Sequence, residues 1–323
     1  MAAAASLEAA VSLRRMMLAA GLCTAAASAQ AATQVLVISG LGGEPQYDER
    51  FQQWSEKVAK ASVAAAGGEQ NVVRLSGEAA KREAIEQRMG AIAKALGPGD
   101  QFVLVLIGHG SFDGNEYRLN IPGPDITGAE LLALLDRIPD TVPQLIVNTT
   151  STSGAVSDRW SKANRVVVTA TRTGGERNAT RFAGFWADAL ASEAADRDKD
   201  GAVTAKEAYD FAVRGVEDAF KSDAAIVSEH AKITGADPAR FVVARLGAAA
   251  LFASDAELMA LRKQQTGIEQ KLAQLKPLKT QLPQDEYYNR IEPVLVELAH
   301  LGAKVDARLA ALGAAPGGSN AKP

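Results

Sequence analysis

Cysteine is almost absent from this sequence, and its scarcity excludes several kinds of chemistry. The 323 residues contain one cysteine, three histidines and 5% aromatic residues. The cysteine, Cys23, lies in a segment with the features of a cleaved leader. The mature chain would then have no thiol nucleophile, no disulfide and no cysteine-based zinc site.

A surplus of positive charge and long apolar runs are also missing. Lys plus Arg number 35 and Asp plus Glu number 38, a formal net charge of −3. Without a basic surface, phosphate-backbone binding has no electrostatic support, so we expect no nucleic-acid partner. Beyond the leader, no apolar run approaches the roughly 18 residues of a membrane helix, so we expect no membrane span. The content of 47% hydrophobic and 23% charged residues is ordinary for a globular α/β protein.

The first 31 residues are typical of a secretory signal peptide. Arg14 and Arg15 precede an apolar stretch that ends in small residues with an Ala-x-Ala pattern. We expect cleavage after Ala31 and a periplasmic or secreted mature protein. The alternative for this segment is an alanine-rich amphipathic start to the folded chain.

Short runs of β-branched residues alternate with helical patterns from residue 34 onward. The runs are continuously apolar, as in strands that are covered on both faces. Strands separated by helices predict a three-layer α/β/α fold with a mostly parallel sheet, whose sites gather at the carboxyl ends of the strands. The predicted strands are residues 34–39, 71–75, 101–107, 144–149 and 165–171.

The composition changes after Ser254. Apolar residues then recur every seven positions, and a similar stripe resumes beyond a turn-like Pro283-Gln284-Asp285. This pattern predicts an α/β domain over residues 32–254, a helical hairpin over residues 255–312 and a disordered tail over residues 313–323. Hairpins of this kind pack or dimerise, so the hairpin is a candidate for homo-oligomer formation.

A histidine follows the third predicted strand, in Gly108-His109-Gly110-Ser111. At the carboxyl end of a buried parallel strand, between glycines, His109 is well placed to act as a general base. The alternative is a structural turn histidine. His230 and His300 have no comparable setting, and His300 falls within the predicted hairpin.

Hydroxyl side chains crowd the end of the fourth predicted strand. Residues 148–154 read Asn-Thr-Thr-Ser-Thr-Ser-Gly, a composition that suits a nucleophile loop or an oxyanion loop. The alternative is a turn in which serine and threonine hydroxyls satisfy the local backbone.

Together, these two loops resemble those of the caspase/legumain superfamily, in particular the bacterial legumain-like (C13-type) peptidases. The second loop of legumain-type sequences reads Glu-Ala-Cys-x-Ser-Gly, and its Ser-Gly corresponds to Ser153-Gly154. The resemblance covers about residues 34–250 and implies a caspase-like sheet. It also implies His109 as the base, Ser151 at the nucleophile position, and the backbone N–H groups of Gly110 and Ser151 as oxyanion donors.

Two catalytic features of that superfamily are missing here. Ser151 replaces the nucleophilic cysteine, and an alcohol is a much poorer nucleophile than a thiol near neutral pH. Residues 40–43, Gly-Leu-Gly-Gly, occupy the first-strand loop in place of the assisting asparagine and lack the Gly-x-Gly-x-x-Gly spacing of a dinucleotide site.

These departures predict a catalytically inactive homologue that binds a peptide or protein. One alternative is an active hydrolase in which His109 activates Ser151. Another is an interaction module that acts through the C-terminal hairpin.

An acidic segment, residues 196–207, matches the calcium loop of an EF-hand. Aspartates two residues apart can reach one cation, a glycine turns the chain at the sixth position, and a final glutamate can supply two oxygens. We therefore expect Ca²⁺ as a bound ion. The alternative is a solvated acidic loop in which Thr204 and Glu207 cap a helix. The predicted ligands are Asp196, Asp198, Asp200, the Ala202 carbonyl, Thr204 and Glu207.

The leader hypothesis predicts the amino terminus of the mature protein. Mass spectrometry of protein from its native host should find a chain that starts close to Ala32. A full-length chain that retains Cys23 would contradict export and would restore the possibility of thiol chemistry.

Overall fold

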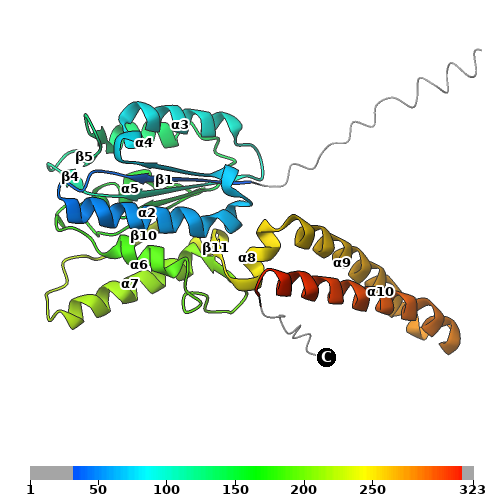
Figure 1. The fold of residues 1–323 in the computed structure, drawn as a ribbon. Helices are drawn as coiled ribbons and strands as arrows, with labels where there is room; N and C mark the ends of the chain where they lie inside the picture. The colour runs from blue at the N-terminus through cyan, green and yellow to red at the C-terminus, as the bar shows by residue number, and fades with distance from the viewer. Residues whose placement is uncertain (1–31, 315–323) are drawn as a thin grey trace, which may run out of the picture. The chain divides into compact units, whose positions relative to one another are not determined.

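A six-stranded sheet forms the centre of the fold. The computed structural model describes residues 32–314 (Figure 1). The strand order is β10-β8-β7-β3-β1-β2, with β10 antiparallel to its neighbour and the other five strands parallel. The five predicted strands are confirmed, whereas the edge strand β10 was not predicted. The strands are β1 (Thr33–Ser39), β2 (Val72–Ser76), β3 (Gln101–Ile107), β7 (Gln144–Asn148), β8 (Arg165–Thr169) and β10 (Lys232–Gly235).

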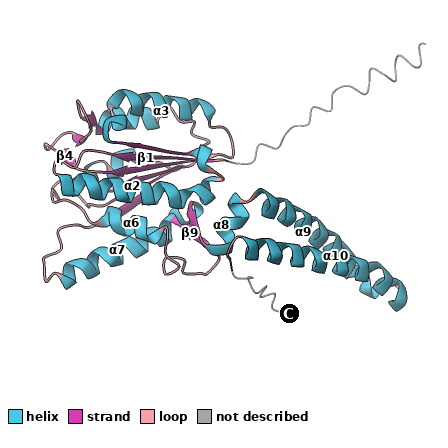
Figure 2. Cartoon of the chain, viewed as in Figure 1, coloured by secondary structure: helices cyan, strands magenta, loops and turns pink. Residues whose placement is uncertain are grey.

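Helices cover both faces of this sheet, which confirms the predicted three-layer α/β/α class (Figure 2). Alternate strand residues enter two separate cores: Val35 and Val37 pack with α2, α6 and α7, and Leu36 and Ile38 pack with α3 and α4. Because both faces are buried, the strands need apolar residues at nearly every position. The helices are α2 (Pro45–Ala66), α3 (Arg82–Ala95), α4 (Gly128–Leu135), α5 (Ser157–Trp160), α6 (Phe182–Ala189) and α7 (Ala205–Ser222).

The sheet changes its winding direction at β1. The chain continues from β1 to β2 on one side and then crosses to β3 on the other, so the loops after β1 and β3 diverge. The two loops stay in contact, since the Gly40 N–H donates to the Ile107 carbonyl at 2.8 Å. Sites in open α/β sheets lie at such a point, and His109 follows β3 there.

Two smaller sheets were not predicted. One follows His109 directly and consists of three short antiparallel strands. The other joins the acidic segment to a strand further along the chain, with Val203 opposite Ala244. These strands are β4 (Gly110–Phe112), β5 (Tyr117–Leu119), β6 (Ile126–Thr127), β9 (Ala202–Thr204) and β11 (Val242–Arg245).

The predicted helical hairpin is present and has its own apolar core. Asp255 accepts a hydrogen bond from the Leu258 N–H at the hairpin's start and pairs with Arg308 at 2.6 Å. Pro293 lies inside the second helix of the hairpin. The hairpin and the helix before it comprise α8 (Gly247–Ser254), α9 (Ala256–Leu275) and α10 (Gln284–Ala311).

Short 3₁₀ turns complete the fold. They are η1 (Glu69–Asn71), η2 (Gly77–Ala80), η3 (Ser153–Ala155), η4 (Pro238–Arg240) and η5 (Lys276–Thr280). No helix within residues 32–314 combines the length with the apolarity of a membrane-spanning helix. The predicted signal peptide and most of the predicted tail lie outside the described residues.

Candidate functional site

The His109 imidazole lies against two aromatic rings of α2. Its ring centroid is 4.9 Å from that of Tyr47 and 5.0 Å from that of Phe51, both in edge-to-face geometry. Burial lowers the pKa of His109, and the nearby Gly42 backbone and Asp48 carboxylate only partly oppose this effect. The neutral imidazole is therefore favoured, the form that a general base requires.

Ser151 lies beside Gly110. Its Oγ donates to the Gly110 carbonyl and accepts from the Gly110 N–H, both at 3.3 Å. A side chain at position 110 would not fit, because a Cβ there would lie 2.5 Å from the Ser151 carbonyl oxygen. Ser151 is only 2% exposed, and within residues 32–314 no hydrogen bond joins its hydroxyl to the His109 imidazole. The structure thus pairs Ser151 with Gly110.

The other hydroxyls of this loop bond mainly to neighbouring polar groups of the protein. Thr149 Oγ1 donates to the Leu106 carbonyl at 2.8 Å. Thr150 Oγ1 bonds to Asn148 Oδ1 at 2.8 Å and to the Tyr117 hydroxyl at 2.7 Å. Burial raises the pKa of Tyr117 to about 12, so this phenol stays protonated. This pattern favours the interpretation that the hydroxyls satisfy the turn itself.

Thr152 has an unusual backbone conformation that the sequence does not signal. Its φ is 58°, in the left-handed region, which is rare for a β-branched residue. The side chain is buried, and its Oγ1 has no hydrogen-bond partner. The Thr152 N–H donates to the Glu176 carbonyl at 2.9 Å. Backbone strain of this kind persists where surrounding contacts enforce it and is common at functional sites.

Glu176 connects the loop after β8 to the segment before β10. Its carboxylate accepts hydrogen bonds from the backbone N–H groups of His230 and Arg172, at 3.0 and 3.2 Å. The other carboxylate oxygen lies 3.2 Å from His230 Nδ1. His230 therefore has a structural role next to the Ser/Thr-rich loop.

A second carboxylate, that of Glu229, is buried at the start of α6. Its two oxygens accept from the backbone N–H groups of Arg181 and Phe182, each at 2.8 Å. Glu229 is 5% exposed. Burial raises its pKa to about 7, although the two N–H donors favour the ionised form. No sequence pattern singles out this residue, because an isolated glutamate before a strand is ordinary.

The acidic segment brings three of its predicted ligands together. Carboxylate oxygens of Asp196, Asp198 and Glu207 lie within 4.8 Å of one another. Asp196 is 5% exposed, and its Oδ1 has no hydrogen-bond partner while Oδ2 accepts from the Gly201 N–H at 3.0 Å. An unpaired oxygen on a buried carboxylate is costly, and a cation at this position would remove that cost.

Two of the remaining predicted ligands, Asp200 and Thr204, have other contacts. Asp200 Oδ1 accepts from the Ala202 N–H at 2.7 Å, and Asp200 is not part of the three-carboxylate group. Thr204 and Glu207 form the helix-capping box that was the alternative interpretation of this segment. Burial acts to raise the pKa of Glu207, but its hydrogen bonds from Thr204 and the Arg197 N–H outweigh burial and lower it. Glu207 is therefore ionised near neutral pH, as a metal ligand must be.

The acidic segment is held by long-range contacts. Its strand β9 pairs with β11, and the Leu246 N–H donates to the Gly201 carbonyl at 2.8 Å. On its amino-terminal side, α6 ends at Ala189, well before Asp196. In this respect the segment differs from a loop between two continuous helices.

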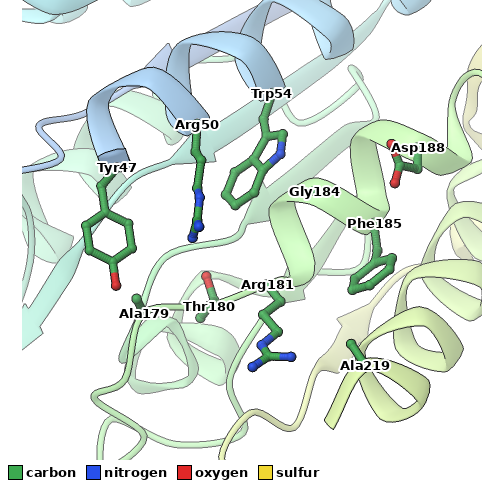
Figure 3. Close-up of a pocket in the computed structure, with 10 residues that line it drawn as sticks. All are labelled: Tyr47, Arg50, Trp54, Ala179, Thr180, Arg181, Gly184, Phe185, Asp188 and Ala219. Atoms are coloured by element: carbon green, nitrogen blue, oxygen red, sulfur yellow. The ribbon is translucent and has the colours of Figure 1, made fainter. Parts of the chain in front are cut away.

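A cavity of about 560 Å³ is lined in part by Tyr47, whose ring also contacts the His109 imidazole (Figure 3). Residues of α2, the segment before α6, α6 itself and α7 line it. Sequence reasoning did not identify this cavity, because its lining comes from positions that are distant in the chain. The lining residues are Tyr47, Arg50, Trp54, Ala179, Thr180, Arg181, Gly184, Phe185, Asp188 and Ala219.

Comparison with known proteins assigns no family. No family model matches the sequence, and no curated protein matches it. Among solved structures, this chain is similar to protein GSU0716 from Geobacter sulfurreducens, with 15% sequence identity and a TM-score of 0.44. The match covers 65% of this chain and 97% of that one. A similarity at this level identifies neither a family nor a function.

The raised pKa of Glu229 predicts a pH-dependent stability. Between about pH 4.5 and 7 the folded state keeps a proton that the unfolded state loses, so wild-type stability should fall as pH rises through this range. Glu229→Gln should remove this decrease in the free energy of unfolding, which is on the order of 3 kcal/mol over the whole pH interval. Urea denaturation at several pH values measures it, with exposed Glu217→Gln as the matched control. Equal pH dependence in the wild type and Glu229→Gln would contradict the prediction.

Proposed function

We propose that this protein is a calcium-stabilised, non-catalytic homologue of the caspase/legumain-like peptidases that binds a peptide or protein ligand. The observation that supports the absence of catalysis best is the state of Ser151. Its hydroxyl is buried and hydrogen-bonded to both the N–H and the carbonyl of Gly110.

This arrangement opposes acyl transfer in two ways. A serine nucleophile needs a base within hydrogen-bond reach to accept its proton, but the Ser151 hydroxyl donates to the Gly110 carbonyl. An oxyanion needs N–H donors that point into the reaction site, but the Gly110 N–H is bonded to Ser151 Oγ. The Ser151 hydroxyl and the Gly110 N–H, which acyl transfer would use, are therefore hydrogen-bonded to each other.

One observation favours the alternative, an active hydrolase. The strained backbone of Thr152 directly follows Ser151, and such strain is common in catalytic loops. In that case the His109 imidazole would take the Ser151 proton while Oγ attacks the carbonyl carbon of an acyl substrate, and would pass that proton to the leaving group as its bond to the carbonyl carbon breaks. Ser151 would first have to leave Gly110, since the two residues are hydrogen-bonded.

Calcium binding has separate support from the acidic segment. Asp196, Asp198 and Glu207 offer clustered carboxylate oxygens, the ligands that Ca²⁺ prefers, and Asp196 Oδ1 has no other partner. When bound, the ion would neutralise these charges. It would also link the turn at Asp196 to the start of α7, where Glu207 lies.

A serine-reactive probe tests the absence of catalysis. We expect a fluorophosphonate not to label the wild type, because Ser151 is buried and unactivated. Ser151→Ala should lower the free energy of unfolding by about 1–2 kcal/mol, since both hydrogen bonds to Gly110 are lost. Ser111, exposed on β4, provides the control: Ser111→Ala should change stability by less than about 0.5 kcal/mol. Labelling and peptide hydrolysis that both disappear in Ser151→Ala would establish the hydrolase instead.

Thermal unfolding with and without calcium tests the ion site. Calcium should raise the wild-type melting temperature by mass action, with a stabilisation of about 2.7 kcal/mol at one hundred times the dissociation constant. The double variant Asp196→Asn, Glu207→Gln should not respond. Asp210→Asn is the matched control, because Asp210 is on α7 and pairs with Lys206 outside the site. An unchanged wild-type melting temperature at millimolar calcium would rule out the site.

A further inference from the structure

The cavity lined by Tyr47 has aromatic walls from two helices. Tyr47 and Trp54 extend from α2, and Phe185 extends from α6 (Figure 3). The glycine at position 184 allows Trp54 to pack closely against α6, since a Cβ there would lie 3.1 Å from the Trp54 indole ring. Such walls favour a flat apolar group by burial and ring contact.

The charged side chains around the cavity differ in whether they already have an ion-pair partner. Asp188 pairs with Lys57 at 2.5 Å, and Arg181 pairs with Asp223 at 2.6 Å. Arg181 also lies over the Phe220 ring, 4.5 Å from its centroid. Arg50 extends between Tyr47 and Trp54 in Figure 3, and among residues 32–314 no carboxylate lies within ion-pair distance of it. The uncompensated charge of the lining is therefore positive.

We propose that this cavity binds an aromatic carboxylate, with its ring against the aromatic wall and its carboxylate on Arg50. A guanidinium is suited to a carboxylate because it can donate two parallel hydrogen bonds. The volume of about 560 Å³ is within the usual range for small-ligand sites. The inference gives a ligand class to the proposed binding role and rests on that role, but it is independent of the state of Ser151.

A free aromatic acid and a peptide that ends in an aromatic residue both carry an aromatic ring and a carboxylate. Three probes separate these sources: 3-phenylpropionate, N-acetyl-Ala-Phe with a free carboxylate, and N-acetyl-Ala-Phe-amide. Calorimetry should detect binding of at least one acid, with an affinity at least tenfold greater than that of the amide. If 3-phenylpropionate binds as tightly as the peptide acid, the site accepts free acids. If the peptide acid alone binds, the site is specific for a peptide C-terminus.

Substitution of Arg50 tests the position of the carboxylate. Arg50→Gln should weaken binding of the acid at least tenfold and leave the weak binding of the amide unchanged. Arg88→Gln, exposed on α3 in the opposite helical layer, should have no effect. Tryptophan fluorescence provides a second readout, because Trp160 and Trp186 are buried and Trp54 lines the cavity.

Two results would overturn this inference: no binding of either acid at millimolar concentration, or equal affinities for the acid and the amide. An Arg50→Gln variant that is folded by its melting temperature and binds the acid like the wild type would also overturn it. None of these results changes the fluorophosphonate outcome at Ser151, so failure of the ligand class is distinguishable from failure of the non-catalytic assignment.

Discussion

Burial of both faces of the central strands is the constraint on which the rest of this structure depends. Residues that alternate along β1 enter two different cores, so both faces of the sheet are mainly apolar there. The polar side chains that could take part in chemistry therefore lie mainly at the ends of the strands. His109 follows β3 and the Ser/Thr-rich loop follows β7 for this reason, and the parallel pairing of β3 with β7 places the two loops side by side.

The layers of the fold could be predicted because short, continuously apolar runs between helical patterns are typical of strands buried on both faces. The edge strand β10 was missed, since its Lys-Ile-Thr-Gly is short and only partly buried. The small sheets were also missed, because their strands of two to four residues carry little periodicity. Such elements depend on tertiary contacts, which single-sequence patterns do not encode.

Prediction of the site was limited in the same way. The resemblance implied catalytic roles for Ser151 and Gly110, but the direction of the Ser151 hydroxyl depends on how closely the two backbones approach. The positive φ of Thr152 and the cavity that Tyr47 lines depend on contacts between segments far apart in sequence. In the acidic segment the spacing predicted a calcium loop and a helix cap, and the structure shows the cap together with three clustered carboxylates.

The pairing of β9 with β11 affects the order in which this protein can fold. The acidic segment has consecutive ligands, so its sequence suggests a unit that forms by itself. In the structure, however, Val203 pairs with Ala244, and the Gly201 carbonyl accepts from Leu246. Contacts between distant residues form late, because the intervening chain must first be ordered. The acidic segment can therefore reach its final shape only after the chain through Leu246 has been synthesised.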